Sequence, residues 1–211
     1  MTPSSTASSA AGDARAPVAA IVLCGGASAR HGGIDKTAQD LAGHSVLGRL
    51  VADLPGDWPV VCVGTPRPLP RPVEWTCEEP PLGGPVAGIV AGLLLVDSPV
   101  TLVLAGDLPF AGPLATVLAE RLRQAPADVD GIQARPAGDD GQVLFAAYRT
   151  DALRGILPPV PSQARDRGVH RVLRSLTVRT HLVPSEAAWD LDTPADLTRA
   201  RRLLAGPREA G

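Results

Sequence analysis

VAAIVL, residues Val18–Leu23, and the loop CGGASARHGGIDK, residues 24–36, decide the fold. A continuous apolar run that ends in glycines is typical of a parallel strand buried on both faces of a sheet. Four glycines in the loop let the backbone approach a bulky anion, because no Cβ stands in the way. Consecutive N–H groups in such a loop form a concave anion site. The stretch therefore predicts an α/β fold with an anion-binding loop after its first strand.

The rest of the chain repeats the alternation of apolar runs and amphipathic stretches. Further strands are expected over 59–63, 73–76, 100–105, 129–134, 142–148 and 178–183, and helices over 46–54, 85–96, 113–123, 150–157, 169–176 and 194–204. This order predicts a single-domain Rossmann-like three-layer sandwich over 17–206, with a mostly parallel sheet and helices on both faces. The Ser/Ala-rich residues 1–16 are expected to be a disordered tail. Sheets of this kind bind ligands beyond the carboxyl ends of their strands.

Composition narrows the class of protein. The hydrophobic fraction is 45%, the charged fraction 20% and the formal charge −2, so electrostatics give no reason to expect nucleic acid or a membrane as partner. The longest apolar run, 86–96, is too short to span a bilayer, and the first residues lack the features of a secretory signal. Three cysteines without a CxxC motif predict neither a zinc site nor a disulfide framework. We expect a cytoplasmic protein.

Two basic residues stand out in the glycine-rich loop. Lys36 is the only lysine among the 20 basic residues, and Arg30 lies six positions before it. A guanidinium and an ammonium group are suited to binding phosphates. The loop is not a Walker A motif, because Asp35 occupies the place of the glycine before Lys36-Thr37. The dinucleotide-binding glycine pattern also fails. The alternative is a flexible glycine loop with solvated charges.

Asp107 follows the strongest predicted strand, 100–105. A carboxylate at the end of a buried strand is costly unless it is solvated or binds a cation. Mg²⁺ in nucleotide sites takes one or two carboxylates together with phosphate oxygens. Asp107 is therefore the expected ligand of Mg²⁺, the predicted cofactor.

The pattern L-x-G-G-x-S-x-R-x-G-G-x-D-K over 23–36 resembles the signature of the molybdenum cofactor guanylyltransferases, the MobA-type branch of the nucleoside-triphosphate transferases. The chain departs from that signature at Cys24, where the family has alanine, and at His31, where it has methionine. Cytidylyltransferases that act on the same pterin tend to have L-A-A-G and a Pro-Lys pair, so Gly26 and Asp35 favour GTP.

Two later segments extend the resemblance. EEPPLGGPVAG over 78–88 is similar to the family's motif of an acidic residue followed by G-P-L-A-G. The resemblance implies that Glu78, which aligns best by spacing, or alternatively Glu79 recognises guanine, although the family usually has aspartate there. Gly64 replaces the family's asparagine after the second strand. The segment 189–197 is similar to the family's closing motif, with Asp190 and Asp192 in place of two asparagines, and either could supply a second metal carboxylate.

The resemblance implies transfer of GMP from GTP to the phosphate of molybdopterin, with release of pyrophosphate. It assigns catalytic roles to Lys36, Arg30 and Asp107, and metal binding to Asp107 and Asp192. The implied nucleotide contacts are Leu23, Cys24, Gly25, Gly26, Ser28, Lys36, Gly64, Glu78, Gly84 and Asp107. Transient contact with cofactor-biosynthesis proteins or molybdoenzymes fits such a role. The arginines of 165–174 are either a site for the acceptor's phosphate or a solvated helix face.

Two alternatives stay open. The chain could use another nucleotide or acceptor, such as CTP with the pterin or a sugar phosphate. The departures at His31, Gly64, Glu78, Asp190 and Asp192 also fit a noncatalytic nucleotide-binding paralogue.

Overall fold

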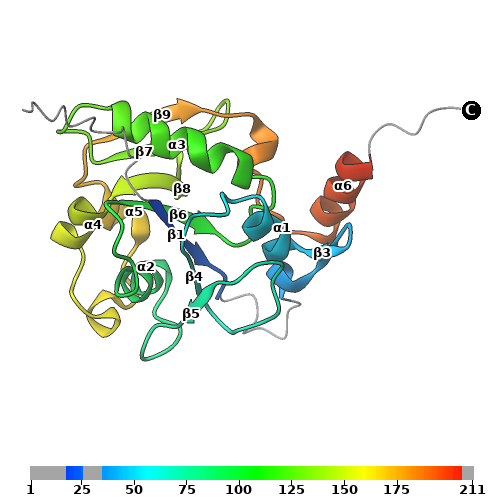
Figure 1. Ribbon diagram of the computed structural model, residues 1–211, viewed down its shortest axis with the longest axis horizontal. Coiled ribbons are helices and arrows are strands. Elements are labelled where there is room, and N and C mark those ends of the chain that lie inside the picture. The colour runs from blue at the N-terminus through cyan, green and yellow to red at the C-terminus, as the bar shows by residue number, and fades with distance from the viewer. Residues whose placement is uncertain (1–17, 26–34, 206–211) are drawn as a thin grey trace, which may run out of the picture.

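The computed structural model describes residues 18–25 and 35–205, and its ribbon is drawn in Figure 1. A central seven-stranded sheet has the order β5-β4-β1-β6-β8-β7-β9. Its strands are β1 (Val18–Leu23), β4 (Val60–Val63), β5 (Glu74–Thr76), β6 (Val100–Ala105), β7 (Gly131–Arg135), β8 (Gln142–Arg149) and β9 (Val178–Leu182). All seven were predicted from the sequence. The predicted tail over 1–16 lies outside the described residues.

The sheet is parallel except for one strand. β1 pairs in parallel with β4 on one side and with β6 on the other, while β8 runs antiparallel to both β6 and β7. A short connection between β7 and β8 forces the antiparallel pairing, since parallel neighbours need a long crossover. The chain adds β4 and β5 on one side of β1, and β6 then pairs with β1 on its other side. The strand order therefore reverses at β1. The carboxyl ends of β1, β4, β5 and β6 meet at one edge.

Helices cover both faces of the sheet, which confirms the predicted three-layer sandwich (Figure 1). The helices are α1 (Val46–Ala52), α2 (Pro85–Leu93), α3 (Gly112–Gln124), α4 (Thr150–Ile156), α5 (Val169–Leu173) and α6 (Pro194–Ala205), with short 3-10 turns η2 (Lys36–Ala38), η3 (Pro161–Ala164) and η4 (Ser185–Ala188). One core cluster joins α1 and α3 to the sheet, and a second joins α2, α4 and α5 to the opposite face. Side chains of β1 alternate between the two clusters, as the period of a strand requires.

Glycines in α2 set how closely this helix approaches β1. A Cβ added at Gly92 would lie 2.7 Å from a methyl carbon of Ile21, and one at Gly88 would lie 3.1 Å from Leu23. The glycines cost helix propensity, but they let α2 pack directly on the strand that carries the glycine-rich loop. The predicted helix over 85–96 ends earlier, at Leu93.

A third, smaller cluster lies at one end of the molecule. It joins α6 to the short hairpin of β2 (Asp40–Leu41) and β3 (His44–Ser45), with Leu41, Leu191 and Ala200 fully or almost fully buried. Arg201 of α6 donates to the carbonyl oxygen of Asp40 at 3.1 and 2.6 Å, and Figure 1 shows α6 beside β3. The hairpin was not predicted, because two-residue strands are too short to show a period.

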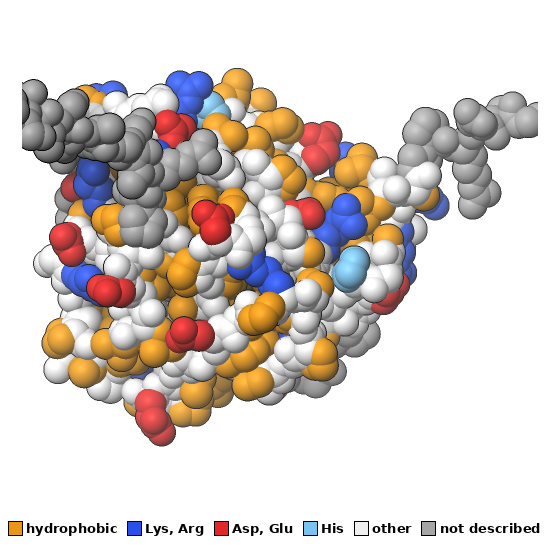
Figure 2. Space-filling view, in the orientation of Figure 1, with side chains coloured by type: hydrophobic (Ala, Val, Ile, Leu, Met, Phe, Trp, Pro, Cys, Tyr) orange, Lys and Arg blue, Asp and Glu red, His pale blue; other side chains and the backbone are white. Residues whose placement is uncertain are grey.

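The mixed charges on the surface (Figure 2) are consistent with the small net charge of the chain. On the face drawn in Figure 2, acidic and basic side chains are interspersed among hydrophobic ones. Within the described residues, each helix is too short or too polar to cross a membrane.

Candidate active site

A cavity of about 570 Å³ opens at the sheet edge where the strands β1, β4, β5 and β6 end. Eight of the nine described residues predicted to bind nucleotide or metal line it: Leu23, Cys24, Gly25, Lys36, Gly64, Glu78, Gly84 and Asp107. The ninth, Asp192, does not line the cavity but contacts Lys36. Gly26, Ser28 and Arg30 lie outside the described residues, as does His31. The cavity therefore brings Lys36 and Asp107, which come from separate strand ends, into one site.

The backbones after β1 and β4 touch at the floor of this site. Cys24 donates its N–H to Val63 at 3.0 Å, and a Cβ added at Gly64 would lie only 2.9 Å from the nitrogen of Gly25. Gly64 also has φ +152°. A side chain at position 64 would thus be strained and would push the two loops apart, which is a physical reason for glycine where the family has asparagine.

Lys36 is surrounded by aspartates. Its Nζ donates to Oδ1 of Asp192 at 2.7 Å. This hydrogen bond raises the pKa of Lys36 against the opposing effect of burial, and the charges of Asp192, Asp107 and Asp190 add to the rise. The segment of Asp190 and Asp192 also contacts Asp107, because Leu191 donates its N–H to the carbonyl oxygen of Asp107 at 3.1 Å. That backbone bond attaches the closing segment to the end of β6.

The carboxylates outnumber the described cations beside them. Burial raises the pKa of Asp107, and the charges of Asp190 and Asp192 raise it further although Lys36 opposes them. Burial and the charge of Asp192 likewise raise the pKa of Asp190. An excess of negative charge in a half-buried site favours binding of a further cation.

The carboxylates of the site are suited to a magnesium ion, although they do not form a complete set of protein ligands. Over residues 18–25 and 35–205, no group of three or more His, Cys, Asp or Glu side chains is arranged to hold a metal ion. Mg²⁺ does not need one, because it keeps several waters and takes one or two carboxylates plus phosphate oxygens. Asp107 and Asp192, both hard oxygen ligands beside Lys36, are compatible with that mode of binding.

Glu78 has a structural role that the sequence did not reveal. Its Oε1 accepts hydrogen bonds from the N–H groups of Leu82 and Gly83 at 3.1 and 3.2 Å. The carboxylate thereby holds the tight loop before α2, in which Leu82 and Gly84 have φ of 70° and 87°. Gly84 is the N-cap of α2 and makes no side-chain cap, so the first N–H groups of this helix are left for other acceptors.

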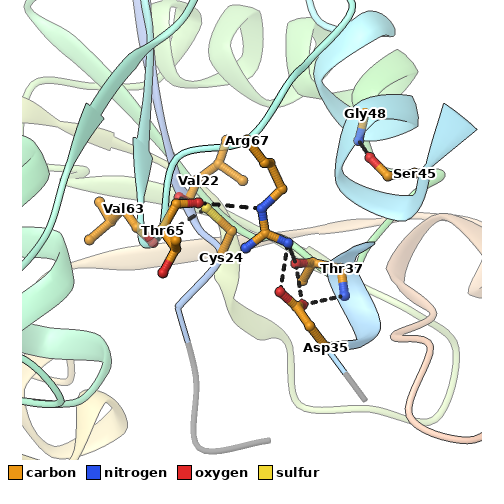
Figure 3. Close-up of polar contacts among 9 residues, drawn as sticks. All are labelled: Val22, Cys24, Asp35, Thr37, Ser45, Gly48, Val63, Thr65 and Arg67. Carbon is orange, nitrogen blue, oxygen red and sulfur yellow. Dashed lines mark hydrogen bonds and ion pairs between the residues drawn. The ribbon is translucent and has the colours of Figure 1, made fainter. Parts of the chain in front are cut away.

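Sequence reasoning missed a second network at the cavity wall, drawn in Figure 3. Arg67 donates from Nη1 to Oδ2 of Asp35 at 2.7 Å and to Oγ1 of Thr37 at 2.9 Å. Burial opposes ionisation of Asp35, but the hydrogen bond from Thr37 and the charge of Arg67 prevail and lower its pKa. All three residues line the cavity. Arg67 lies in the proline-rich segment 66–72, where no sequence motif singles it out.

The arginines of 165–174 do not line the cavity. Arg165 donates to the carbonyl oxygen of Pro81 at 3.3 Å, and Asp166 donates its N–H to Gly83 at 2.9 Å. This segment therefore supports the Glu78 loop from outside. Its predicted role in binding the acceptor stays a prediction.

Comparison with known proteins agrees with this geometry. Residues 20–181 match the model of the MobA-like NTP transferase domain family. A molybdenum cofactor guanylyltransferase of Mesorhizobium japonicum is 31% identical over 207 residues, which cover 90% of this chain and 97% of that protein. A probable molybdenum cofactor guanylyltransferase of Natronomonas pharaonis is 29% identical over 203 residues, 87% of this chain and 96% of that protein.

Solved structures share the fold. The molybdopterin-guanine dinucleotide biosynthesis protein A of Archaeoglobus fulgidus superposes with a TM-score of 0.64 at 22% identity, covering 88% of this chain and 98% of that one. A CMP:2-keto-3-deoxy-manno-octonic acid synthetase complexed with CTP gives a TM-score of 0.68 at 17% identity, covering 90% and 99%. With its motifs gathered at one sheet edge and its similarity running over most of its length, the chain belongs to the MobA-like NTP transferase family.

Proposed function

We propose that this protein is a magnesium-dependent guanylyltransferase that transfers GMP from GTP to the terminal phosphate of molybdopterin and releases pyrophosphate. The observation that carries the proposal is that Lys36 and Asp107 line one cavity. Relatives similar over nearly their whole length are named molybdenum cofactor guanylyltransferases, which supports the choice of nucleotide and acceptor.

The chain's own residues supply charge and position. Lys36, together with Arg30 of the glycine-rich loop, neutralises the triphosphate and the departing pyrophosphate. Lys36 is bound to Asp192 at 2.7 Å, so it exchanges this carboxylate for a phosphate oxygen when nucleotide enters. No general base is required, because a phosphate monoester is already ionised near neutral pH, and phosphoryl transfer depends mainly on positioning and charge stabilisation.

Asp107 and Asp192 are the residues that would hold Mg²⁺. The bound ion would neutralise phosphate charge that accumulates during the transfer. Asp107 comes from the end of β6 and Asp192 from the segment before α6, and the bond from Leu191 to Asp107 keeps the two segments together. Two carboxylates would suffice for such an ion, because phosphate oxygens and waters supply its other ligands.

Guanine recognition is assigned to the wall formed by Glu78 and Gly84. A carboxylate can accept both the N1–H and the exocyclic amine of guanine. Oε1 of Glu78 already accepts two backbone N–H groups, which leaves the two lone pairs of Oε2 to accept from the base. The loop bonds therefore hold Glu78 in place while it contacts the base.

Two other functions have specific support. CTP or a sugar phosphate is the alternative within the same chemistry, because the fold is shared with a synthetase that binds CTP. A noncatalytic nucleotide-binding paralogue is the alternative outside it, motivated by the departures at Gly64, Glu78, Asp190 and Asp192.

One experiment separates these functions. The melting temperature is measured with GTP, CTP, UTP or ATP, each with Mg²⁺, and pyrophosphate release is then measured with the stabilising nucleotide and molybdopterin. Stabilisation by GTP and release of pyrophosphate are expected. Stabilisation by CTP alone would assign another nucleotide, and binding of GTP without release of pyrophosphate would leave the noncatalytic alternative.

A further inference from the structure

We propose that Arg67 is a positioning residue of this site, which fixes the turn Asp35-Lys36-Thr37 so that the ammonium group of Lys36 meets the triphosphate. The inference rests on the proposed function, since it assigns Arg67 a role through Lys36. The starting observation is a fork of hydrogen bonds that joins two loops distant in sequence at the wall of the cavity.

Arg67 contacts the residues on both sides of Lys36. Its Nη1 lies 2.7 Å from Oδ2 of Asp35 and 2.9 Å from Oγ1 of Thr37, residues separated from it by 32 and 30 positions. Its Nε donates to the carbonyl oxygen of Thr65 at 3.4 Å, which orients the guanidinium within its own loop. Figure 3 shows the guanidinium pointing at Asp35 and Thr37. The Arg67 side chain is only 17% exposed, and its bonds to Asp35 and Thr37 are partly buried.

Besides this fork, the turn that carries Lys36 is held by the ion pair of Lys36 with Asp192 and by the N–H that Val46 donates to the carbonyl oxygen of Gln39. The 3-10 helix η2 has three residues, Lys36–Ala38, and its N-cap Asp35 accepts from the N–H and the hydroxyl of Thr37 at 3.0 and 2.7 Å. None of its residues is buried, so packing contributes little. A 3-10 turn this short is not stable by itself. Arg67 supplies the contact that anchors the turn to the loop after β4.

The position of this turn decides what Lys36 reaches. The Lys36 side chain is 32% exposed, and it bonds Asp192 at 2.7 Å near Asp107. The stem of Lys36 has a fixed length, so the placement of its backbone limits which phosphate oxygens the ammonium group can reach. A displacement of about 1 Å in a reacting group can cost on the order of 100-fold in rate. Loss of the fork is thus expected to reduce catalysis more than stability.

The same loop offers a matched control. Arg71 also bonds through its guanidinium, but its acceptors are the carbonyl oxygens of Leu54, Pro55, Gly56 and Trp58, at 3.2, 2.7, 2.9 and 2.8 Å. Arg71 and these acceptors do not line the cavity. Arg71→Met therefore removes a comparable set of bonds from the same loop without touching the turn of Lys36.

A double-mutant cycle of Lys36→Met and Arg67→Met tests the inference. The kcat of pyrophosphate release with GTP, Mg²⁺ and molybdopterin is measured for both single variants and for the double variant. Arg67→Met is expected to lose on the order of 10-fold to 100-fold in kcat. The double variant is expected to be as slow as Lys36→Met alone, because Arg67 has nothing left to position. Arg71→Met is expected to melt at a lower temperature but to keep the kcat of the wild type.

Two results would overturn the inference. The first is a double variant whose loss is the product of the two single losses, which would make Arg67 an independent contact or a general stabiliser. The second is an Arg67→Met variant with wild-type kcat. Should Arg67→Met not fold, Asp35→Asn tests the same link from its other end in the same cycle. A Lys36→Met variant with wild-type kcat would instead contradict the proposed function, so the two failures are distinguishable.

Discussion

Replacement of Lys36 by methionine is expected to separate activity from stability. Methionine keeps an unbranched stem of similar length and removes only the ammonium group. Among the described residues that group pairs with Asp192, and the two side chains are 32% and 59% exposed. Exposed ion pairs contribute at most about 1 kcal/mol to stability. For a chain of this size that corresponds to a fall in melting temperature of no more than about 2–4 °C.

The effect on the reaction is expected to be much larger. Loss of one preorganised charge partner of a developing anion typically costs on the order of 100-fold to 1,000-fold in kcat. The assay is pyrophosphate release from GTP and molybdopterin with Mg²⁺, alongside thermal melts with and without Mg²⁺. Because the variant leaves Asp107, Asp190 and Asp192 without their lysine, Mg²⁺ should raise its melting temperature more than that of the wild type. A kcat within about 5-fold of the wild type would refute the reasoning, because the expected loss is on the order of 100-fold or more.

Three further predictions concern the carboxylates. Asp107→Asn should lose on the order of 100-fold in kcat, yet melt at a higher temperature than the wild type at neutral pH without Mg²⁺. Burial and the neighbouring aspartates raise the pKa of Asp107, so its ionised form opposes folding above that pKa; an unchanged or lower melting temperature would contradict this. In Glu78→Gln the amide oxygen can still accept from Leu82 and Gly83, so the variant should fold normally. Its KM for GTP should rise on the order of 10-fold, because hydrogen bonds to a charged group are lost. An unchanged KM would exclude Glu78 from base recognition. Asp35 has a lowered pKa, so its contribution to stability is present above its ordinary value of 3.8 and is lost as the pH falls through the folded-state pKa. In urea titrations, the stability gap between wild type and Asp35→Asn should therefore narrow as the pH is lowered, and a gap independent of pH would exclude an ionised Asp35.

The elements of the fold were predictable where hydrophobic side chains form a clear local pattern. β1 and β6 are continuous apolar runs, and both occur as predicted at Val18–Leu23 and Val100–Ala105. The place of β8 between β6 and β7 was not predictable, because it depends on pairing and not on local pattern. The hairpin of β2 and β3 was missed for a different reason, since its turn at Ala42 and Gly43, with φ of 57° and 88°, is flanked by only two residues on each side.

The site was predictable where function requires a residue type at a strand end. Lys36 and Asp107 could be identified in this way, because a lysine in a glycine-rich loop and an aspartate after a buried strand each imply a charged ligand. Arg67 could not, since its role depends on Asp35, 32 positions away. The hydrogen bonds of Glu78 to its own loop could not be predicted either, because its partners are backbone N–H groups, which the sequence does not distinguish.

The small cluster of α6 and the β2–β3 hairpin has a consequence for how the enzyme matures during synthesis. Lys36 precedes the hairpin and Asp192 precedes α6, and the two are 156 positions apart. The strands through β6 and Lys36 are synthesised long before residues 190–205 emerge. Lys36 then lacks Asp192, and Asp107 lacks the backbone bond from Leu191. Competence for transfer is therefore expected to be acquired last, when the final helix docks against Leu41 and the segment before it brings Asp190 and Asp192 to the site.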